Sequence, residues 1–557
     1  MQRSDPLAGS RRSSFAAFGP AEAGNPSPAS DDGGIGGGQD SPDDGSRLVE
    51  CLQRWAAQLA APGSAGPTLG FHPGLHYRWC GRAAELPDRT TIGAVLAATE
   101  HPLPAAWAST LLGGWPPPVS GLHRIELVTG GCWISFALDL TPAARRRLDA
   151  DAAKWGSRSR YRSADEAIVI GAGLAGCALA DALTRRGRQV TVLEAGASPG
   201  GVVSELPLLA QHPALSPGCD PRSRLLIAAL LASVRLRDRL GDAWHWCGRF
   251  QPMPIDEARR RCEGTPAALA EAVACSQAAT HGLADQSGVW FDQCALADPR
   301  QWWQQVQANP GVDVRLAKRV AYIRRQEDRW FVYDDAQQVI ASAPVVILAN
   351  QAGAFELAGM DEDATGALRR SLLQVAIGTG RDNGLDAGRT PARPILGGSC
   401  YRLEHPGVSC VVGPIRQADA ASGAAGAEED PATSIPGAIT SARDIGYRWR
   451  RSAPAERLLL RDNLPMIGAV PAVQAILAQR DRFERNDRLP LPRRDDLYLM
   501  TGLGGRGLLW SVLGAEIIAA AIDDEPPVVE ANLLAAVDPA RFLKRMLQRT
   551  RRIRGSR

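Results

Sequence analysis

The stretch "AIVIGAGLAG" at residues 167–176 has the pattern of a short buried strand that runs into a glycine turn. An apolar helical stretch, "CALADALTRRG" (177–187), and a second strand-like stretch, "QVTVLEAG" (189–196), follow it directly. Strand, glycine turn, helix and strand in this order predict a βαβ unit. The sequence therefore predicts an α/β domain that begins near Glu166 rather than at the start of the chain.

The glycines of this turn have the G-x-G-x-x-G spacing of dinucleotide-binding proteins. Gly171 permits a tight turn, Gly173 lets the backbone approach a pyrophosphate, and Gly176 lets the helix pack on the strand. The phosphates would lie at the helix N-terminus, where free N–H groups favour anions. Glu194 ends the second strand about 20 residues on, where a ribose-binding carboxylate is expected. We expect these residues, together with Ala172, to bind a dinucleotide.

Later segments decide between FAD and NAD. "APVVILAN" (343–350) is another buried-strand candidate, and "DLYLMTGLGGRGLLWSVLGAEIIAAAI" (496–522) repeats the order of strand, glycine turn and apolar helix. A two-domain flavin oxidase returns to its sheet late in the chain, and a glycine-rich turn then covers the isoalloxazine ring, whereas an NAD dehydrogenase needs no such return. We therefore expect FAD. Its further contacts are predicted at Val320, Ala349, Gly504, Gly505, Gly507 and Leu508.

The composition limits the kinds of site that the chain offers. Its 557 residues are enough for more than one domain, and its net charge of +3 requires no polyanionic partner. Only three of its 63 basic side chains are lysines (Lys154, Lys318 and Lys544). An anion site in this chain is therefore expected to use the planar fork of arginine.

Cysteine usage and hydropathy give the expected compartment. The 11 cysteines are scattered and form no C-x-x-C motif, which argues against a disulfide framework or a zinc site and suits a reducing compartment. We find no apolar signal segment at the N-terminus and no run of about 18 apolar residues. We expect a cytoplasmic protein with no metal centre and no membrane span.

With these pieces in place, residues 166–547 resemble a known family. It is the FAD-dependent oxidoreductase half of the bifunctional tRNA 5-methylaminomethyl-2-thiouridine biosynthesis proteins (MnmC), flavoproteins of the D-amino acid and glycine oxidase type. The most specific carriers are "RDNLPMIGAVP" (461–471) and "DEPPVVEANLLAAVDPARFLKRML" (524–547), supported by "WCGRFQ" (246–251) and "GLGGRGLLWSVLGAEIIA" (502–519). The resemblance implies an α/β fold, α+β in part, in which an antiparallel-sheet substrate domain interrupts a Rossmann-type FAD-binding domain.

The resemblance also implies an N-terminal methyltransferase, of which we recognise a truncated remnant. "LPAAWASTLLGGWPPPVSGLHRIEL" (103–127) is similar to part of such a domain. The glycine-rich loop that would bind S-adenosylmethionine is missing before "LHY" (75–77), and the family's D-G-F-A-P-x-K-N-P segment does not follow "FALDL" (136–140). We expect no binding of S-adenosylmethionine and no methyl transfer, so a separate methyltransferase protein is a candidate partner.

The resulting domain prediction has six parts. A Gly-, Ser- and Asp-rich tail at 1–46 is expected to be disordered, and a methyltransferase-like remnant at 47–150 and a linker at 151–165 follow it. The other parts are an FAD-binding domain from 166–240, 297–352 and 494–523, a substrate domain from 241–296 and 353–493, and a basic C-terminal segment at 524–557.

Three segments depart from the family pattern. "GASPGGVVSEL" (196–206) stands in place of the G-A-S-G-N-x-x-G loop and lacks its Asn. "LQVAIGTG" (373–380) and "VGPIRQ" (412–417) stand where the family has its G-Q-V and G-A-S/T-Y segments. The first departure alters the expected FAD contacts, and the other two alter the substrate pocket.

The family substrate is a carboxymethylaminomethyl group on the wobble uridine of tRNA, which is chemically an N-substituted glycine. The resemblance implies flavin-dependent oxidation at its α-carbon, followed by hydrolysis to glyoxylate and 5-aminomethyl-(2-thio)uridine. A bidentate arginine is the best clamp for the substrate carboxylate. Two candidates are Arg457, where glycine-oxidase-like flavoproteins place such an arginine, and Arg506, in the turn expected to face the flavin. A surface salt bridge and a role in holding the turn are the respective structural alternatives.

The C-terminal stretch "RFLKRMLQRTRRIRGSR" (541–557) is expected to form a basic helix. Since a tRNA-modifying enzyme must hold a phosphate backbone, this patch is a candidate for that contact. A solvated charged end is the alternative. The candidate tRNA-binding residues are Arg541, Lys544, Arg545, Arg549, Arg551 and Arg552.

Two other functions stay open on the sequence. One is an FAD-dependent oxidase of a small amine such as glycine or sarcosine, although no lysine lies between Lys318 and Lys544 to activate oxygen as in sarcosine-oxidase-like enzymes. The other is a non-catalytic tRNA-binding remnant, which the altered loop at 196–206 favours. Bound flavin and dependence on tRNA would separate the three.

Overall fold

The chain divides into two units in the computed structural model, Met1–Tyr161 with Val528–Glu530 and Arg162–Pro527 with Ala531–Arg557. The division falls within the predicted linker at 151–165, which itself lies outside the described residues. The structure describes residues 16–18, 46–60, 75–99, 103–128, 132–139, 166–200, 206–217, 220–263, 265, 269–274, 287–361, 369–380, 395–397, 401–405, 408–414, 447–451, 455–486 and 489–555.

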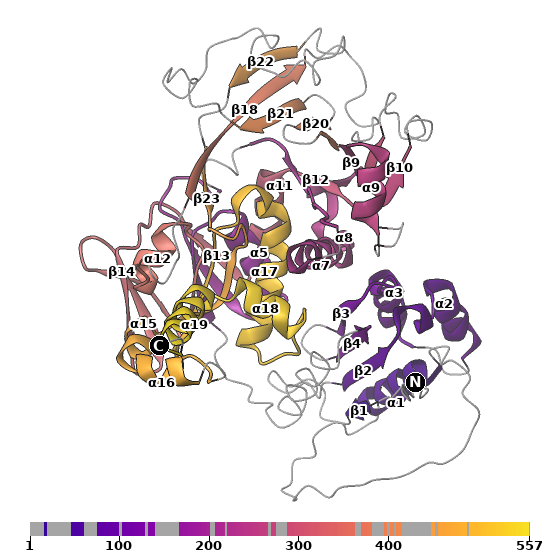
Figure 1. Ribbon diagram of the computed structural model, residues 1–557, viewed down its shortest axis with the longest axis horizontal. Coiled ribbons are helices and arrows are strands. Elements are labelled where there is room, and N and C mark those ends of the chain that lie inside the picture. The colour runs from indigo at the N-terminus through magenta and orange to yellow at the C-terminus, as the bar shows by residue number, and fades with distance from the viewer. Residues whose placement is uncertain are drawn as a thin grey trace, which may run out of the picture. The chain divides into compact units, whose positions relative to one another are not determined.

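The strand that opens the glycine motif, β5 (Glu166–Ile170), lies inside a six-stranded sheet of the second unit (Figure 1). Four of its five residues are buried, as expected for a strand covered on both faces. All neighbouring pairs are parallel except the last, β25 with β24. The order is β13 (Val312–Arg315), β6 (Gln189–Leu193), β5, β17 (Val345–Leu348), β25 (Arg493–Thr501) and β24 (Met466–Pro471).

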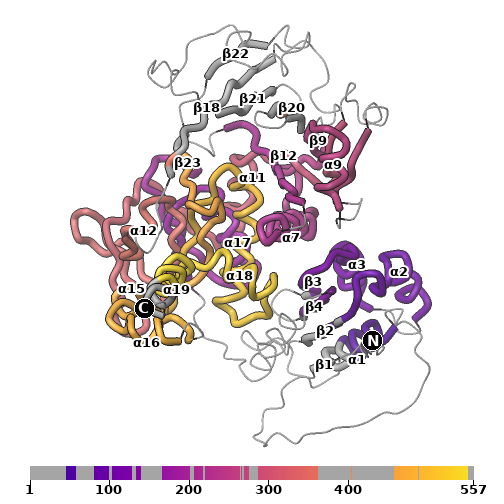
Figure 2. Tube along the Cα trace, in the orientation of Figure 1, coloured from indigo at the N-terminus to yellow at the C-terminus, as the bar shows by residue number. Residues whose placement is uncertain are grey.

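Two apolar helices follow the two glycine turns and pack on each other, α5 (Leu174–Thr184) and α17 (Gly507–Ile522). α17 also packs against α7 (Pro221–Arg235) (Figure 2). The stretch Gly504–Ile522 is long and apolar enough to span a membrane by length and composition, which the sequence analysis did not allow for. However, 67% of its apolar window is buried inside the structure, so it is the core helix of this domain.

A larger, mostly antiparallel sheet is built from the segments between the strands of the first sheet. Its order is β10-β11-β9-β19-β20-β21-β18-β22, with β23 also paired to β18. Its strands are β9 (Arg249–Pro252), β10 (Glu271–Val273), β11 (Gly288–Phe291), β18 (Arg369–Gly380), β19 (Ile395–Gly397), β20 (Tyr401–His405), β21 (Val408–Pro414), β22 (Tyr447–Arg451) and β23 (Ala455–Leu459). The predicted fold class, a Rossmann-type domain interrupted by an antiparallel sheet, is confirmed.

Smaller elements complete this unit. A meander of β14 (Tyr322–Gln326), β15 (Arg329–Tyr333) and β16 (Val339–Ala343) precedes β17. A three-stranded sheet joins β7 (Leu209–Ala210), β12 (Ala295–Ala297) and β8 (Trp244–Trp246). The remaining helices are α8 (Arg237–Leu240), α9 (Ile255–Cys262), α11 (Pro299–Gln307), α12 (Gly353–Ala358), α15 (Val473–Ala478), α16 (Arg480–Arg485), α18 (Ala531–Val537) and α19 (Arg541–Gly555).

One predicted domain boundary is wrong. The sequence placed residues up to 493 in the substrate domain, but β24 pairs with β25 in the parallel sheet. Met466, Ile476 and Phe483 are buried in the same core cluster as Ile168 and Leu499. The chain therefore returns to the FAD-binding domain at Met466, because the apolar stretch "MIGAV" (466–470) forms the edge strand of its sheet.

The predicted basic C-terminal segment is integrated into this core. Phe542, Leu543 and Leu547 of α19 are buried in the cluster that contains the sheet residues. α19 also packs against α16. The apolar face of α19 is therefore packed into the core, and only the residues on its remaining surface are available to a binding partner.

The N-terminal unit has its own small sheet and core. The sheet order is β1 (Ala16–Phe18), β2 (Leu75–Gly81), β4 (Cys132–Leu138) and β3 (Gly121–Val128). Its helices are α1 (Ser46–Ala60), α2 (Arg89–Ala98) and α3 (Ala105–Gly114). Because β1 pairs with β2 and Ser46 begins α1, the prediction of disorder for 1–46 is wrong at these four residues. The rest of that tail, up to residue 45, lies outside the described residues.

Candidate active site

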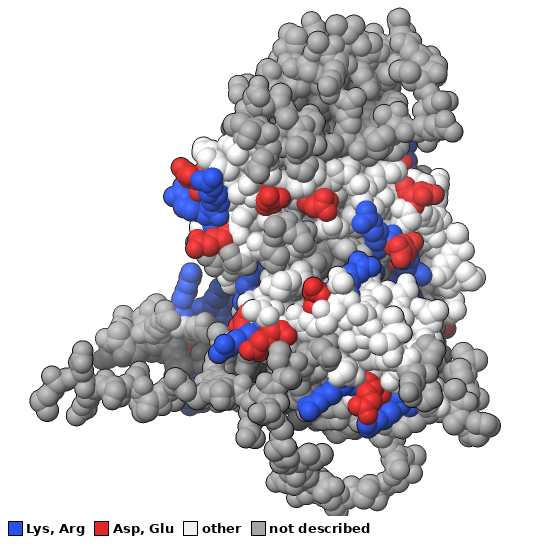
Figure 3. Space-filling model, turned by 90° about the vertical axis from the view of Figure 1, so that its right-hand side faces the viewer, with Lys and Arg blue, Asp and Glu red and all other residues white. Residues whose placement is uncertain are grey.

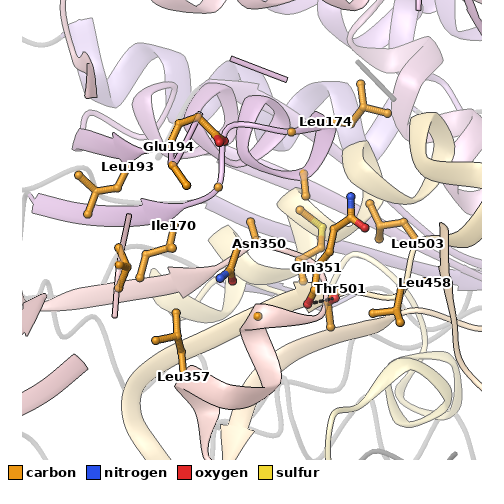
Figure 4. A pocket seen from close by; sticks show the side chains of 18 of the residues that line it. Ile170, Leu174, Leu193, Glu194, Asn350, Gln351, Leu357, Leu458, Thr501 and Leu503 are labelled. Carbon is orange, nitrogen blue, oxygen red and sulfur yellow. Dashed lines mark hydrogen bonds between the residues drawn. The ribbon is translucent and has the colours of Figure 1, made fainter. Parts of the chain in front are cut away.

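A cavity of about 440 Å³ opens at the carboxyl ends of the parallel strands. Ile170, Leu193 and Thr501, the last residues of β5, β6 and β25, contribute to its wall. Ligands of open α/β sheets bind at this edge. Figure 4 shows Glu194 and Leu193 toward one end of the cavity and Leu458 and Leu503 toward the other. Of the predicted FAD contacts, those that line it are Gly171, Gly173, Glu194, Val320, Ala349, Gly504 and Gly507.

The three glycines of the first turn differ in how much space a side chain would find at each position. Gly171 has φ +105, and an added Cβ would lie 2.8 Å from the Ala349 carbonyl oxygen. A Cβ on Gly176 would lie 2.0 Å from the Gly171 carbonyl oxygen, so this position requires glycine for packing. A Cβ on Gly173 would meet nothing within 4 Å, and Gly173 lines the cavity. At Gly173 the backbone itself therefore faces the cavity.

Glu194 is held by two backbone donors beside this turn. The Ala172 N–H donates to Oε2 and the Gly196 N–H donates to Oε1, each at 2.8 Å. The backbone N–H of Lys318 donates to the Glu194 carbonyl at 2.8 Å, which brings the β13–β14 connection to the same end of the cavity. A carboxylate fixed in this way can accept hydrogen bonds from a ribose diol.

The sequence reasoning missed the polar residues that follow β17. The Oδ1 atom of Asn350 is buried and has no hydrogen-bond partner among the described residues, and Asn350 lines the cavity. Gln351 has φ +54, and its carbonyl accepts a 2.7 Å hydrogen bond from the Thr501 hydroxyl (Figure 4). The strand candidate "APVVILAN" (343–350) ended at Asn350, and nothing in the sequence indicated which way Asn350 and Gln351 face.

These features fit a bound FAD. Two glycine turns face the cavity, the N-terminus of α5 opens at it, and Asn350 presents a buried acceptor that a ligand donor would satisfy. The volume lies in the range of cofactor pockets, about 300–1,000 Å³. Four predicted contacts, Ala172, Gly176, Gly505 and Leu508, are not among the lining residues. Within the altered loop, Gly200 lines the cavity and residues 201–205 lie outside the described residues.

A second cavity of about 360 Å³ adjoins the first, and the two share Arg457, Gly502, Leu503 and Gly504. Four arginines line it, and none of its described lining residues is an aspartate or a glutamate. The full lining is His212, Ala214, Arg222, Arg249, Gln251, Arg457, Leu459, Asn463, Gly502, Leu503, Gly504, Gly505, Arg506 and Trp510.

The two predicted substrate arginines meet in this second cavity. Arg457 is half-buried on β23, and its Nη1 atom is 3.0 Å from the place that a Cβ on Gly505 would take. Arg506 ends the 3₁₀ turn Gly504–Arg506, and its Nε donates to the His212 carbonyl at 3.3 Å. Arg457 therefore stands at the junction of the two cavities, whereas Arg506 lines only the second and also holds the turn.

His212 is a site residue that the sequence reasoning missed. Its Nε2 atom hydrogen-bonds the Gly505 carbonyl, and a carbonyl only accepts, so Nε2 carries the proton. Burial, followed by the positive charges of Arg506 and Arg249, lowers the pKa of His212 to about 3. The imidazole is therefore neutral at pH 7 and adds no charge to the four guanidinium groups.

Arg249 and Arg222 complete the cluster and were also missed. Arg249 is 3% exposed, and its Nη1 donates to Gln251 Oε1 at 3.0 Å and to the Pro213 carbonyl at 3.3 Å. Its guanidinium carbon lies 5.5 Å from the centre of the Phe291 ring. Arg222 is the second residue of α7. The motif "WCGRFQ" (246–251), which supports the family resemblance, contains Arg249, but nothing in the sequence indicated a function for this arginine.

The prediction that Arg541 binds tRNA is wrong. Arg541 is 4% exposed, and its guanidinium pairs with Asp462 at 2.9 Å and donates to the Leu464 carbonyl at 2.9 Å. Its role is to dock α19, because a buried, paired guanidinium is not available to a phosphate backbone. Arg545 is half exposed and also pairs with Asp462, at 2.9 Å.

Two other tail residues, Lys544 and Arg549, are exposed on α19. Arg551 and Arg552 fall within the bounds of α19, but their side chains lie outside the described residues. Among the residues that the structure describes, no group of three or more His, Cys, Asp and Glu side chains could hold a metal ion.

Comparisons with known proteins agree with this geometry. The family described as FAD dependent oxidoreductase matches residues 166–521. A "tRNA 5-methylaminomethyl-2-thiouridine biosynthesis bifunctional protein MnmC" from Ralstonia nicotianae is 33% identical over 447 residues, which are 74% of this chain and 65% of the relative. The protein of the same name from Cupriavidus necator is 31% identical, over 75% of this chain and 66% of the relative. The chain thus matches somewhat less than two thirds of each relative's length.

Solved structures with a similar arrangement include a glycine oxidase from Geobacillus kaustophilus and an L-proline dehydrogenase from P. horikoshii. Each has 16% sequence identity and covers 68% of this chain and 98% of its own. The TM-scores are 0.49 and 0.47.

Proposed function

Since the chain belongs to the family of FAD dependent oxidoreductases, we propose that it acts on a C–N bond of a modified tRNA. The substrate is 5-carboxymethylaminomethyl-(2-thio)uridine at the wobble position, and the products are glyoxylate and 5-aminomethyl-(2-thio)uridine. The observation that carries this proposal is the position of Arg457 at the junction of the cavity lined by the two glycine turns and the arginine-lined cavity. The similarity to the two relatives named for this tRNA modification supports the choice of substrate.

In this proposal the first cavity holds FAD through the Gly171–Gly176 turn, Glu194, Asn350 and the Gly504–Gly507 turn. When bound there, FAD supplies the two-electron acceptor. The substrate carboxylate is held by the guanidinium of Arg457, whose planar fork can donate two parallel hydrogen bonds. This pairing orients the α-carbon toward the first cavity, so that the reaction depends on positioning more than on a protein acid or base.

His212 and the neighbouring apolar residues set the electrostatics of this site. A neutral His212 keeps its Nε2 proton in the hydrogen bond to Gly505 and does not transfer it at neutral pH. An apolar part of the wall around the arginines consists of Leu459, Leu503 and Trp510. A site with less water strengthens the attraction between Arg457 and the carboxylate.

The N-terminal unit has no part in this proposal as a methyltransferase. The described residues of Met1–Tyr161 form a four-stranded sheet with helices, and the segment in which a cofactor-binding loop would precede β2 lies outside the described residues. We base the proposed loss of S-adenosylmethionine binding on the sequence alone. The methyl group would then come from a separate protein.

We also propose that α19 contributes to tRNA binding in the cytoplasm, through Lys544 and Arg549. Both are exposed on α19. On the face shown in Figure 3, basic and acidic side chains of the described residues are interspersed. A localised contact of this kind would add to the affinity from the cavity itself.

Nucleoside mass spectrometry tests the proposed function. The purified protein is incubated with tRNA that carries 5-carboxymethylaminomethyluridine, first without and then with S-adenosylmethionine. Conversion to aminomethyluridine that the methyl donor leaves unchanged is the expected result, and further conversion to the methylated base would contradict the proposed loss of methyl transfer. Oxidation of free glycine or sarcosine without any action on tRNA would instead support a small-amine oxidase. A protein that binds tRNA but no FAD would be a non-catalytic remnant.

A further inference from the structure

Four arginines gather around the second cavity. Arg222, Arg249, Arg457 and Arg506 line it, His212 is neutral, and the described part of the lining holds no acidic side chain. Removing a guanidinium from water costs free energy unless an anion or other acceptors compensate it, and this cost applies to the buried Arg222 Nε atom. Since a single carboxylate is satisfied by one bidentate arginine, the arginines beyond Arg457 can bind a second anionic group of the ligand.

The four arginines divide into two sets by position. Arg457 lines both cavities, whereas Arg222, Arg249 and Arg506 line only the second. The Nε atom of Arg222 is buried and has no hydrogen-bond partner within the described parts of the chain. The guanidinium of Arg249 is held in place by Gln251 and by the Pro213 carbonyl. Arg222, Arg249 and Arg506 therefore form a cationic wall of the second cavity beyond the carboxylate clamp, and Arg249 is fixed within it.

We propose that Arg222 and Arg249 bind a phosphate group of the same nucleotide whose side chain is oxidised. This inference rests on the proposed function. The reacting side chain brings one carboxylate, which Arg457 takes, so the other negative charge on a tRNA nucleotide is its phosphate. Two guanidinium groups from different elements, α7 and β9, can each donate to the non-bridging oxygens of one phosphate. The site thus recognises a nucleotide rather than a free amino acid.

The experiment compares two ligands that differ only in the phosphate. The FAD-loaded full-length chain, kept reduced under anaerobic conditions so that no turnover occurs, is titrated with 5-carboxymethylaminomethyluridine and with its 5′-monophosphate. We expect the monophosphate to bind about tenfold more tightly at low salt, because Arg222 and Arg249 would donate charge-assisted hydrogen bonds to its phosphate. Arg222→Gln should remove this difference and leave the affinity for the nucleoside unchanged.

Two further variants serve as controls. Arg224→Gln changes an arginine on the same helix that lines neither cavity, and it should keep the tenfold difference. Arg222→Lys should keep part of it, because it retains the charge without the planar fork. Equal affinity of the wild-type protein for both ligands would overturn the proposal, as would a loss of nucleoside binding in Arg222→Gln that matches the loss for the monophosphate.

The outcome is separable from that of the proposed function. Discrimination between nucleoside and monophosphate that depends on Arg222 supports the phosphate site even if tRNA is not oxidised, and the missing oxidation then counts against the proposed reaction alone. Oxidation of tRNA without any Arg222-dependent discrimination supports the reaction and rejects the phosphate site.

Discussion

The two adjoining cavities are built by different means. The first is shaped by two glycine turns, and its charged lining residues have both signs, with Glu194 and Glu356 beside Lys318, Arg319 and Arg457. The second has four arginines and no acidic residue among its described lining. The first cavity therefore selects its ligand by backbone shape and the second by charge. Substitutions in the first cavity should therefore affect cofactor binding, and substitutions in the second should affect substrate binding.

The largest effect is expected from Gly176→Ala in the first cavity. The new Cβ would lie 2.0 Å from the Gly171 carbonyl oxygen, so α5 must move away from β5. We expect the free energy of unfolding to fall by about 3 kcal/mol, as overpacking of a core does, and the purified protein to lack FAD. Urea denaturation and the visible flavin absorbance measure the two quantities.

Gly173→Ala is the matched control in the same turn. An added Cβ meets nothing within 4 Å, and the backbone φ of −74° suits alanine, so stability should stay near that of the wild-type protein. FAD affinity should still fall, because the methyl group enters the space for the pyrophosphate. A strongly destabilised Gly173→Ala, or a Gly176→Ala that holds FAD normally, would contradict the assignment of packing to one glycine and ligand approach to the other.

The next largest effect is expected from Arg457→Gln, at the junction of the cavities. Loss of the carboxylate clamp should lower kcat/KM by about 100-fold, or about 2.7 kcal/mol, while FAD content stays unchanged. Steady-state kinetics and the flavin spectrum check this. The control is Arg461→Gln, an exposed arginine nearby that lines neither cavity and should leave both quantities unaltered.

A smaller effect is expected from the pH dependence that His212 gives to stability. Burial and the nearby arginines lower the pKa of His212 to about 3 in the folded state, against about 6.5 in the unfolded state. The neutral form is therefore stabilised by folding, and this contribution is complete above pH 6.5 and is lost as the pH falls toward 3. Between these values the loss is about 1.4 kcal/mol per pH unit.

The measurement is the free energy of unfolding in urea at pH 7 and at pH 5. The wild-type protein should lose more stability over this interval than His212→Gln, which has no group to titrate at this position. Parallel pH dependences in the two proteins would show that His212 does not titrate as its surroundings indicate.

The smallest effect is expected outside both cavities, on α19. Arg549→Gln removes one exposed charge and should weaken tRNA binding about threefold and reduce the salt dependence by about one counterion, with no change in stability. Arg541→Gln should instead lower the stability of the fold rather than the affinity for tRNA, because it removes the buried partner of Asp462. Filter binding at several salt concentrations, combined with urea denaturation, distinguishes the two.

The sequence by itself determined the first cavity in outline. The order of strand, G-x-G-x-x-G turn and helix is local in the chain, and backbone constraints such as the φ of Gly171 act over a few residues. The late return of the chain through Thr501 and Gly504 was visible for the same reason. These local signals predicted the Rossmann-type domain and part of the lining of its cavity, but not Asn350 and Gln351.

Only the tertiary structure decided the second cavity and the fate of the tail. The sequence indicated Arg457 and Arg506, but His212, Arg222 and Arg249 come from segments far from both in the chain, and one arginine among so many carries no sign of where its side chain points. Arg541 belonged to a basic run in the sequence, yet Asp462, far away in the chain, makes it a buried structural residue. Charge clusters form through contacts between distant segments, whereas glycine turns are set by the local backbone, and this is why the sequence predicts the first cavity in outline but only two of the four arginines of the second.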